Sequence, residues 1–149
     1  MGLRYSYEEK EAEVATLPPS RDMPCSVIND TCNIDFVDDD SWDSWSPKVG
    51  ATYHLSEEAR IYTAWTRGFR SGGYNLRNTS TDPADVPGPF DQEEVNNFEV
   101  GYKSSFERGR LNGAFFYTDI NDMQREVNKA GMFGVIQLIQ NTADARIFG

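Results

Sequence analysis

The stretch from Phe90 to Thr118 constrains the fold most, because its apolar side chains recur at every second position. It contains two such runs, each with one apolar, aromatic face and one polar face. The apolar faces comprise Phe98, Val100, Tyr102 and Phe106 in the first run and Leu111, Gly113, Phe115 and Tyr117 in the second. Successive side chains of a β-strand leave opposite sides of the chain, so a period of two indicates strands. The polar Glu107-Arg108-Gly109 between the runs contains the glycine that a tight turn favours, and the stretch therefore predicts a β-hairpin.

A hairpin with one apolar and one polar face fits two environments. In a soluble sandwich the apolar face packs on a second sheet and the polar face meets water. In a transmembrane barrel the apolar face meets lipid and the polar face lines the interior. The sequence contains no run near the ~20 apolar residues that a transmembrane helix needs, and its mean hydropathy is −0.62. A barrel strand is half polar, so this hydropathy is compatible with a barrel.

Similar alternation along the 149 residues predicts about six antiparallel strands. They are expected at residues 2–14, 46–55 and 60–74, in the two arms of the hairpin at 90–118, of which the second extends to 127, and at 135–149. Residues 15–44 and 75–89 are expected to be long, proline-containing loops, and residues 56–59, 107–109 and 128–134 are expected to be turns. In the strand at 60–74 the phase is open, because either Tyr62, Ala64 and Thr66 or Ile61, Thr63, Trp65 and Phe69 would form the apolar face. Short turns at one end and long loops at the other are typical of an outer-membrane barrel. The predicted fold class is therefore an all-β, antiparallel up-and-down meander of about six strands, an open segment of a transmembrane β-barrel.

Composition and motifs argue against several functions. The net charge is −10 without any basic run, which disfavours a nucleic-acid partner. His54 is the only histidine, and Glu93 and Glu94 are adjacent and would face opposite sides of a strand, so no acid/base or nucleophilic constellation is formed. One histidine with two cysteines does not make a convincing zinc site. We therefore expect no enzyme activity, no metal and no cofactor.

Five stretches resemble one protein family, in the family's order and at similar spacing. They are Ser46–Gly50, Tyr62–Gly73, Glu94–Lys103, Phe115–Gln124 and Asn141–Ala145. Together they resemble the barrel of TonB-dependent outer-membrane receptors. The resemblance implies a Gram-negative outer-membrane location and a complete barrel of about 22 strands with a plugged lumen. It also implies energised uptake of a bulky solute of the ferric siderophore, cobalamin or oligosaccharide class.

The same resemblance implies that residues 1–149 are a partial β-barrel domain. The plug domain, the N-terminal segment that contacts the inner-membrane TonB complex, and the terminal strands are then expected outside this sequence. Expected partners are outer-membrane lipid, the remainder of the barrel and its plug, the TonB complex and a small-molecule solute. A soluble or secreted carbohydrate-binding or adhesive β-sandwich is the alternative, and a secreted β-rich hydrolase is a third, for which the sequence shows no site.

Three groups of residues are candidates for specific roles. Lys48, Glu99 and Lys103, with Arg67 or Arg70 depending on strand phase, are expected to face the lumen. There they would contact the plug or solute, or form structural cross-strand pairs. Trp42 and Trp45 are expected to be interfacial aromatic anchors near the outer rim. Cys25 and Cys32 have a spacing that suits a small disulfide-closed loop in an exported protein, with two free thiols as the alternative.

Overall fold

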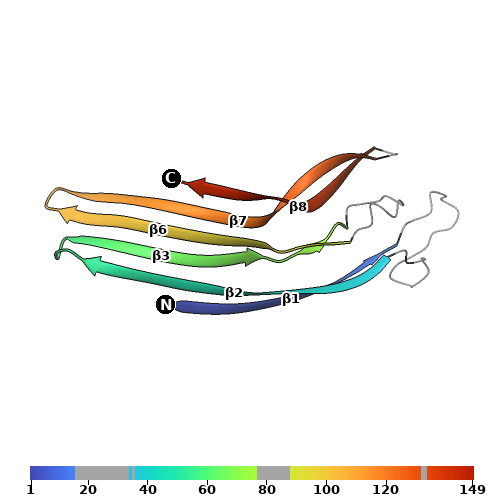
Figure 1. Ribbon diagram of the computed structural model, residues 1–149, viewed down its shortest axis with the longest axis horizontal. Helices are drawn as coiled ribbons and strands as arrows, with labels where there is room; N and C mark the ends of the chain where they lie inside the picture. Colours follow the sequence, from blue (N-terminus) through green and yellow to red (C-terminus); the bar gives the residue numbers. More distant parts are fainter. Residues whose placement is uncertain (16–33, 35, 77–87, 132–133) are drawn as a thin grey trace.

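The computed structural model describes residues 1–15, 34, 36–76, 88–131 and 134–149. In this part of the chain the protein forms a six-stranded antiparallel sheet and a separate two-stranded sheet (Figure 1). The large sheet has the order β1 (Gly2–Val14), β2 (Phe36–His54), β3 (Ala59–Arg70), β6 (Glu93–Phe106), β7 (Gly109–Gly131) and β8 (Gly134–Phe148). The small sheet pairs β4 (Gly73–Tyr74) with β5 (Pro89–Phe90). The open, all-β meander of six strands is therefore confirmed. Within these residues the chain contains no helix that is long and apolar enough to cross a membrane.

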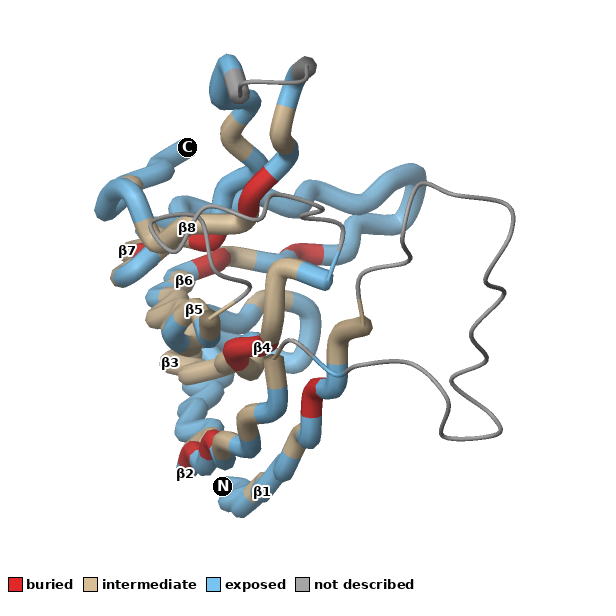
Figure 2. The backbone as a smooth tube through the Cα atoms, turned by 90° about the vertical axis from the view of Figure 1, so that its right-hand side faces the viewer, coloured by how far each residue is buried: buried red, intermediate tan, exposed pale blue. Residues whose placement is uncertain are grey.

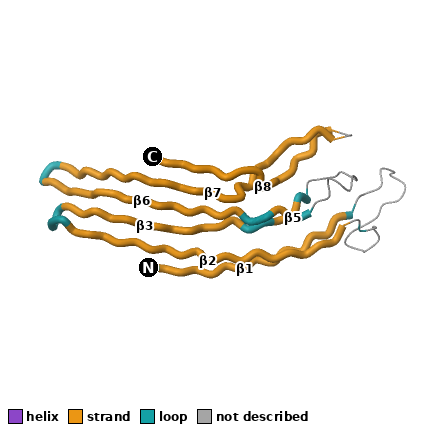
Figure 3. The backbone as a smooth tube through the Cα atoms, in the orientation of Figure 1, coloured by secondary structure: helices purple, strands orange, loops and turns teal. Residues whose placement is uncertain are grey.

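The two short turns lie at the same end of the large sheet. Residues 55–58 join β2 to β3 and residues 107–108 join β6 to β7, on the left in Figure 1. The first turn is closed by Ser56, whose Oγ accepts hydrogen bonds from the backbone N–H of Ala59 (3.1 Å) and Glu58 (3.3 Å). The C-terminal ends of β1, β3 and β7 lie at the opposite end (Figure 1). The β2–β3 and β6–β7 turns thus share one end of the sheet, as predicted (Figure 3), whereas β7 and β8 meet at the opposite end, where Gly131 pairs with Gly134.

Three predicted boundaries are wrong. β2 begins at Phe36 rather than near residue 46, so the acidic run Asp38–Asp40 is a strand that pairs with β1 and not a loop. Backbone pairing needs no apolar side chains, and an extended β1 supplies a partner for every residue of this acidic segment. The strand expected at 60–74 ends at Arg70, and the turn expected at 128–134 is shorter because β7 continues to Gly131.

The strand register shows which side chains share a face. Between Ala59 and Arg70, β3 pairs with β6 without interruption, and Trp65 lies opposite Phe98. Ile61, Thr63, Trp65 and Phe69 therefore belong to the apolar face, and Tyr62, Ala64 and Thr66 belong to the polar face. The alternation predicted for the hairpin of β6 and β7 is confirmed, because Val100 lies opposite Phe115 and Glu99 lies opposite Phe116.

The apolar face of the large sheet is open to the surroundings. Among the described residues the buried hydrophobic side chains are only Ala12, Trp42, Ile120 and Leu138. Large side chains of the apolar face are exposed, Phe115 by 77% and Tyr53 by 71%, and most of the tube in Figure 2 is coloured as exposed. A soluble domain would bury such side chains between two layers. The six long strands form one sheet, and the large side chains on its apolar face stay exposed, so the sandwich alternative is not supported.

Asp122 interrupts the regular pairing of β7 with β8. Among the described residues it is the one non-glycine residue with a positive φ, of 53°, and the register shifts on both sides of the neighbouring Met123. Aspartate tolerates this left-handed conformation better than most residues, whereas a β-branched side chain does not.

We predict that Asp122→Val lowers the free energy of unfolding by about 1–2 kcal/mol, the cost of a left-handed conformation for an ordinary residue. Asn128→Val is the matched control, because Asn128 lies in the regular part of β7 opposite Gln137, where a β-branched residue is favoured. Urea unfolding of both variants in detergent micelles measures the difference. Equal effects of the two substitutions would show that the backbone at Asp122 carries no special constraint.

Candidate functional site: the polar face of the large sheet

The small sheet lies against one face of the large sheet and connects its two halves. On the β1 side, the Nζ of Lys10 donates hydrogen bonds to Ser71 Oγ (2.9 Å) and to the carbonyl oxygen of Gly72 (2.5 Å). On the β7 side, Nε2 of Gln124 donates to the carbonyl oxygens of Ser71 (2.9 Å) and Asp91 (3.0 Å). The segments that flank β4 and β5 therefore cross the polar face from β1 to β7, and Figure 2 shows β4 beside the large sheet.

Two asparagines form hydrogen bonds that join the segments around the small sheet to β8. Asn75 binds the backbone of Ile139 twice, donating from Nδ2 to its carbonyl oxygen (3.1 Å) and accepting its N–H at Oδ1 (2.6 Å). Asn141 binds the backbone of Asp91 in the same way, with both distances 2.9 Å. Each side-chain amide thus replaces the donor and acceptor of a neighbouring strand. Sequence reasoning missed both roles. Asn141 lay in a recognised motif, but no local pattern marked Asn75.

Trp42 packs beneath the small sheet. Its side chain is 7% exposed, Lys10 Nζ lies 5.4 Å from its ring centroid, and the Tyr74 ring stands edge-on to it at 6.3 Å. A Cβ at Gly72 would overlap the indole and the carbonyl oxygen of Phe90, so only glycine permits this approach. The expected role of Trp42 as an interfacial anchor is therefore wrong. Trp42 and Trp45 are three residues apart in one strand and face opposite sides.

Trp45 lies on the apolar face. It is 54% exposed, and its ring centroid lies 4.9 Å from that of Tyr5 on β1. Its role as an interfacial anchor stays a prediction.

Burial also affects the Tyr74 hydroxyl. Desolvation, together with the negative charge of Asp38, raises the pKa of Tyr74 to about 12. A phenol is already neutral at physiological pH, so the raised pKa only extends this neutrality to more alkaline pH, and the Tyr74 hydroxyl adds no negative charge beside the acidic run of β2.

Glu99 and Lys103 meet around a tyrosine on the polar face. The hydroxyl of Tyr62 donates a hydrogen bond to Glu99 Oε1 at 2.5 Å, and Lys103 Nζ lies 5.1 Å from the Tyr62 ring centroid. Gly101 lies directly opposite Tyr62, and a Cβ there would overlap the ring. Sequence reasoning missed Tyr62, because the phase of its strand was open.

The other candidates are distributed over both faces. Lys48 and Arg70 lie on the polar face in exposed positions. Arg67 lies on the face of Trp65 and forms an ion pair with Glu94, so of the two alternatives left open by the strand phase, Arg70 and not Arg67 lies on the polar face. Cys25 and Cys32 fall within residues 16–33, outside the described residues, and their disulfide stays a prediction. Within the described residues, no group of three or more His, Cys, Asp or Glu side chains could hold a metal ion.

We predict that Gly72→Val separates the small sheet from Trp42. Overpacking of this kind costs about 1–3 kcal/mol. In a chain that also carries Trp45→Phe and Trp65→Phe, the emission of Trp42 is expected to shift to longer wavelength as water reaches the indole.

Gly68→Val is the matched control, because no atom lies within 4 Å of a Cβ built at Gly68. Unchanged Trp42 emission in Gly72→Val would contradict the packing described above.

Comparison with known proteins places the chain in a family context. A family model described as the β-barrel of TonB-dependent receptor-like proteins matches residues 1–149. The pesticin receptor of Yersinia enterocolitica serotype O:8 / biotype 1B is 31% identical over 102 residues, which are 68% of this chain and 14% of that protein. The pesticin receptor of Yersinia pestis is 34% identical over 77 residues, which are 52% of this chain and 11% of that protein. The match thus spans only 14% of the length of the Yersinia enterocolitica receptor.

A solved structure shares the fold. The crystal structure of the ferric yersiniabactin uptake receptor FyuA from Yersinia pestis superposes with a TM-score of 0.69 at 22% sequence identity. The match covers 97% of this chain and 19% of the FyuA chain. The six-stranded sheet therefore has the arrangement of a segment of a known receptor barrel.

Proposed function

Because the chain belongs to the family of TonB-dependent receptors, we propose that it forms one sector of the barrel wall of an outer-membrane receptor. In this proposal β1 and β8, which end the six-stranded sheet, pair with further strands of the same barrel. Six strands are fewer than the about eight of the smallest membrane barrels, and an unpaired strand edge promotes aggregation. The plug domain and the segment that contacts the TonB complex would belong to other parts of the polypeptide.

The exposed apolar face is the observation that carries the proposal. On β6 it extends from Phe98 to Phe106, and a tilted transmembrane strand needs ~9–11 residues. Charged pairs lie just beyond it, Arg67 with Glu94 and Arg146 with Asp119. An apolar band with a charged border is what a bilayer requires of the outer surface of a barrel.

Aromatic side chains lie near the charged border of the band. Trp65 and Phe98 stack with ring centroids 6.2 Å apart, and Tyr5 packs beside Trp45. Aromatic girdles of this kind mark the two interfaces of membrane barrels. Trp45 and Trp65 are therefore proposed to lie at the level of the lipid head groups.

The polar face would line the barrel interior, where it supports the plug and borders the path of the solute. We propose a bulky solute of the ferric siderophore class, because one similar protein is named for ferric yersiniabactin uptake. The described residues offer hydrogen-bond donors, acceptors and charges rather than reactive groups. In this mechanism the barrel wall is passive, and the energy for uptake comes from the TonB complex of the inner membrane.

Uptake in iron-starved cells tests this function. Deletion of the gene is expected to abolish accumulation of one labelled ferric siderophore from a panel, and the complete gene should restore it. Loss of the TonB complex should have the same effect as the deletion. The proposal would be contradicted if the deletion strain accumulated every compound in the panel as well as the wild type does.

A pair of alanine variants tests the orientation in the membrane. Ala51 lies on the apolar face opposite Thr63, and Ala114 lies on the polar face opposite Gly101. Ala51→Lys is expected to lower the stability of the folded protein in lipid vesicles by about 2–4 kcal/mol, the cost of a lysine facing the middle of the bilayer. Ala114→Lys should have little effect. Urea titrations in vesicles measure both, and equal effects would mean that the apolar face does not contact lipid.

A further inference from the structure

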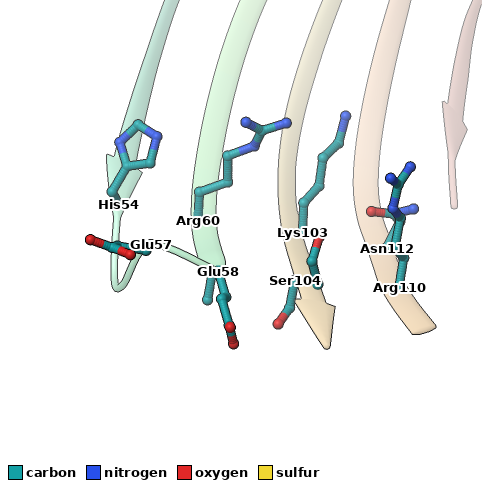
Figure 4. Close-up of a pocket in the computed structure, with 10 residues that line it drawn as sticks. His54, Glu57, Glu58, Arg60, Lys103, Ser104, Arg110 and Asn112 are labelled. Atoms are coloured by element: carbon teal, nitrogen blue, oxygen red, sulfur yellow. The ribbon is translucent and has the colours of Figure 1, made fainter. Parts of the chain in front are cut away.

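Basic side chains form a row across four strands at the short-turn end of the polar face. His54 of β2 lies opposite Arg60 of β3, Arg60 lies opposite Lys103 of β6, and Lys103 lies opposite Asn112 of β7. Arg110 precedes Asn112 by two residues and shares its face. We call these five residues the basic row. Together they line a hollow of about 390 Å³ (Figure 4).

The positive charges of this row are not neutralised within the described part of the chain. The ion pairs found there join Glu8 to Lys10, Arg67 to Glu94 and Asp119 to Arg146, and none includes Arg60, Lys103 or Arg110. Like charges placed directly opposite each other on neighbouring strands destabilise a sheet. Arg60 and Lys103 are such a pair, in a chain whose net charge is −10.

The nearby carboxylates do not relieve this repulsion. Glu57 and Glu58 border the hollow, but Figure 4 shows Glu58 pointing away from the side chains of Arg60 and Lys103, which extend along the strands in the other direction. Glu99 is engaged by the Tyr62 hydroxyl. The basic row therefore offers several hydrogen-bond donors and positive charges to something outside the described residues.

We propose that the basic row is an oxyanion-binding site that takes carboxylate or phosphate groups. Arg60 can hold such a group with two parallel hydrogen bonds, Lys103 adds a point charge, and Asn112 adds an amide donor. The hollow has room for an anion with several such groups.

The proposal rests on the proposed function only in placing the hollow inside the barrel. The oxyanions have two possible sources there, an anionic solute and aspartate or glutamate side chains from another part of the polypeptide.

Citrate binding separates these sources. The complete gene product is purified in detergent micelles without polyvalent anions, as the wild type and as the double variant Arg60→Gln/Lys103→Gln. The control Arg4→Gln/Lys129→Gln removes one arginine and one lysine at exposed positions away from the hollow. If the site takes free anions, calorimetry shows citrate binding to the wild type and the control, and the double variant binds at least about tenfold more weakly, since each hydrogen bond to a charged group contributes that much.

Thermal unfolding tests for the second source, aspartate or glutamate side chains from another part of the polypeptide. If carboxylates of the same polypeptide already fill the site, the wild type binds no citrate and the double variant unfolds at a lower temperature than the control. If the row binds no anion, removing Arg60 and Lys103 relieves repulsion, so the unfolding temperature stays equal or rises and citrate has no effect. That result would overturn the proposal, as would equal citrate binding by all three proteins. None of these measurements involves uptake. The anion-site proposal can therefore fail while the proposed receptor function holds, and the reverse is also possible.

Discussion

Backbone hydrogen bonding between neighbouring strands holds this structure together, because very little side-chain packing does. The six long strands pair along most of their length, while the described residues contain only four buried hydrophobic side chains. A single sheet of this kind has no core to stabilise it in water. Its stability depends on an environment that covers the apolar face, and on further strands that pair with the two outer strands, β1 and β8.

The polar face differs at its two ends. At one end the small sheet closes over Trp42, and Lys10, Gln124 and Asn141 hold the segments around it. At the short-turn end the basic row lies open around a hollow. Next to the basic row, Tyr62 of β3 contacts Glu99 and Lys103 of β6. One end is therefore closed by internal packing, whereas the other carries positive charges that form no ion pair within the described residues.

Much of the fold, but less of the site, could be predicted from the sequence. The hairpin of β6 and β7 was predicted correctly because its alternation is regular and its turn is short. The start of β2 was missed because acidic residues such as Asp39 disfavour strands locally, and only pairing with β1 keeps them extended. Trp42 was misplaced because it lies in this missed part of β2, and the choice between Arg67 and Arg70 stayed open because the phase of their strand was open. The face of a strand residue follows from the register, and an error of one residue reverses it.

The sequence by itself determined the two-faced strands, their number and the family, because side-chain alternation is a local property and the motifs occur in a fixed order. The tertiary structure decided which strand residues share a face in the ambiguous segment at Arg60–Arg70. It also decided that Gly72 lies on Trp42, and that four strands bring His54, Arg60, Lys103 and Asn112 into one row. These contacts join residues far apart in the chain. They depend on how distant backbones pair, which no local pattern encodes.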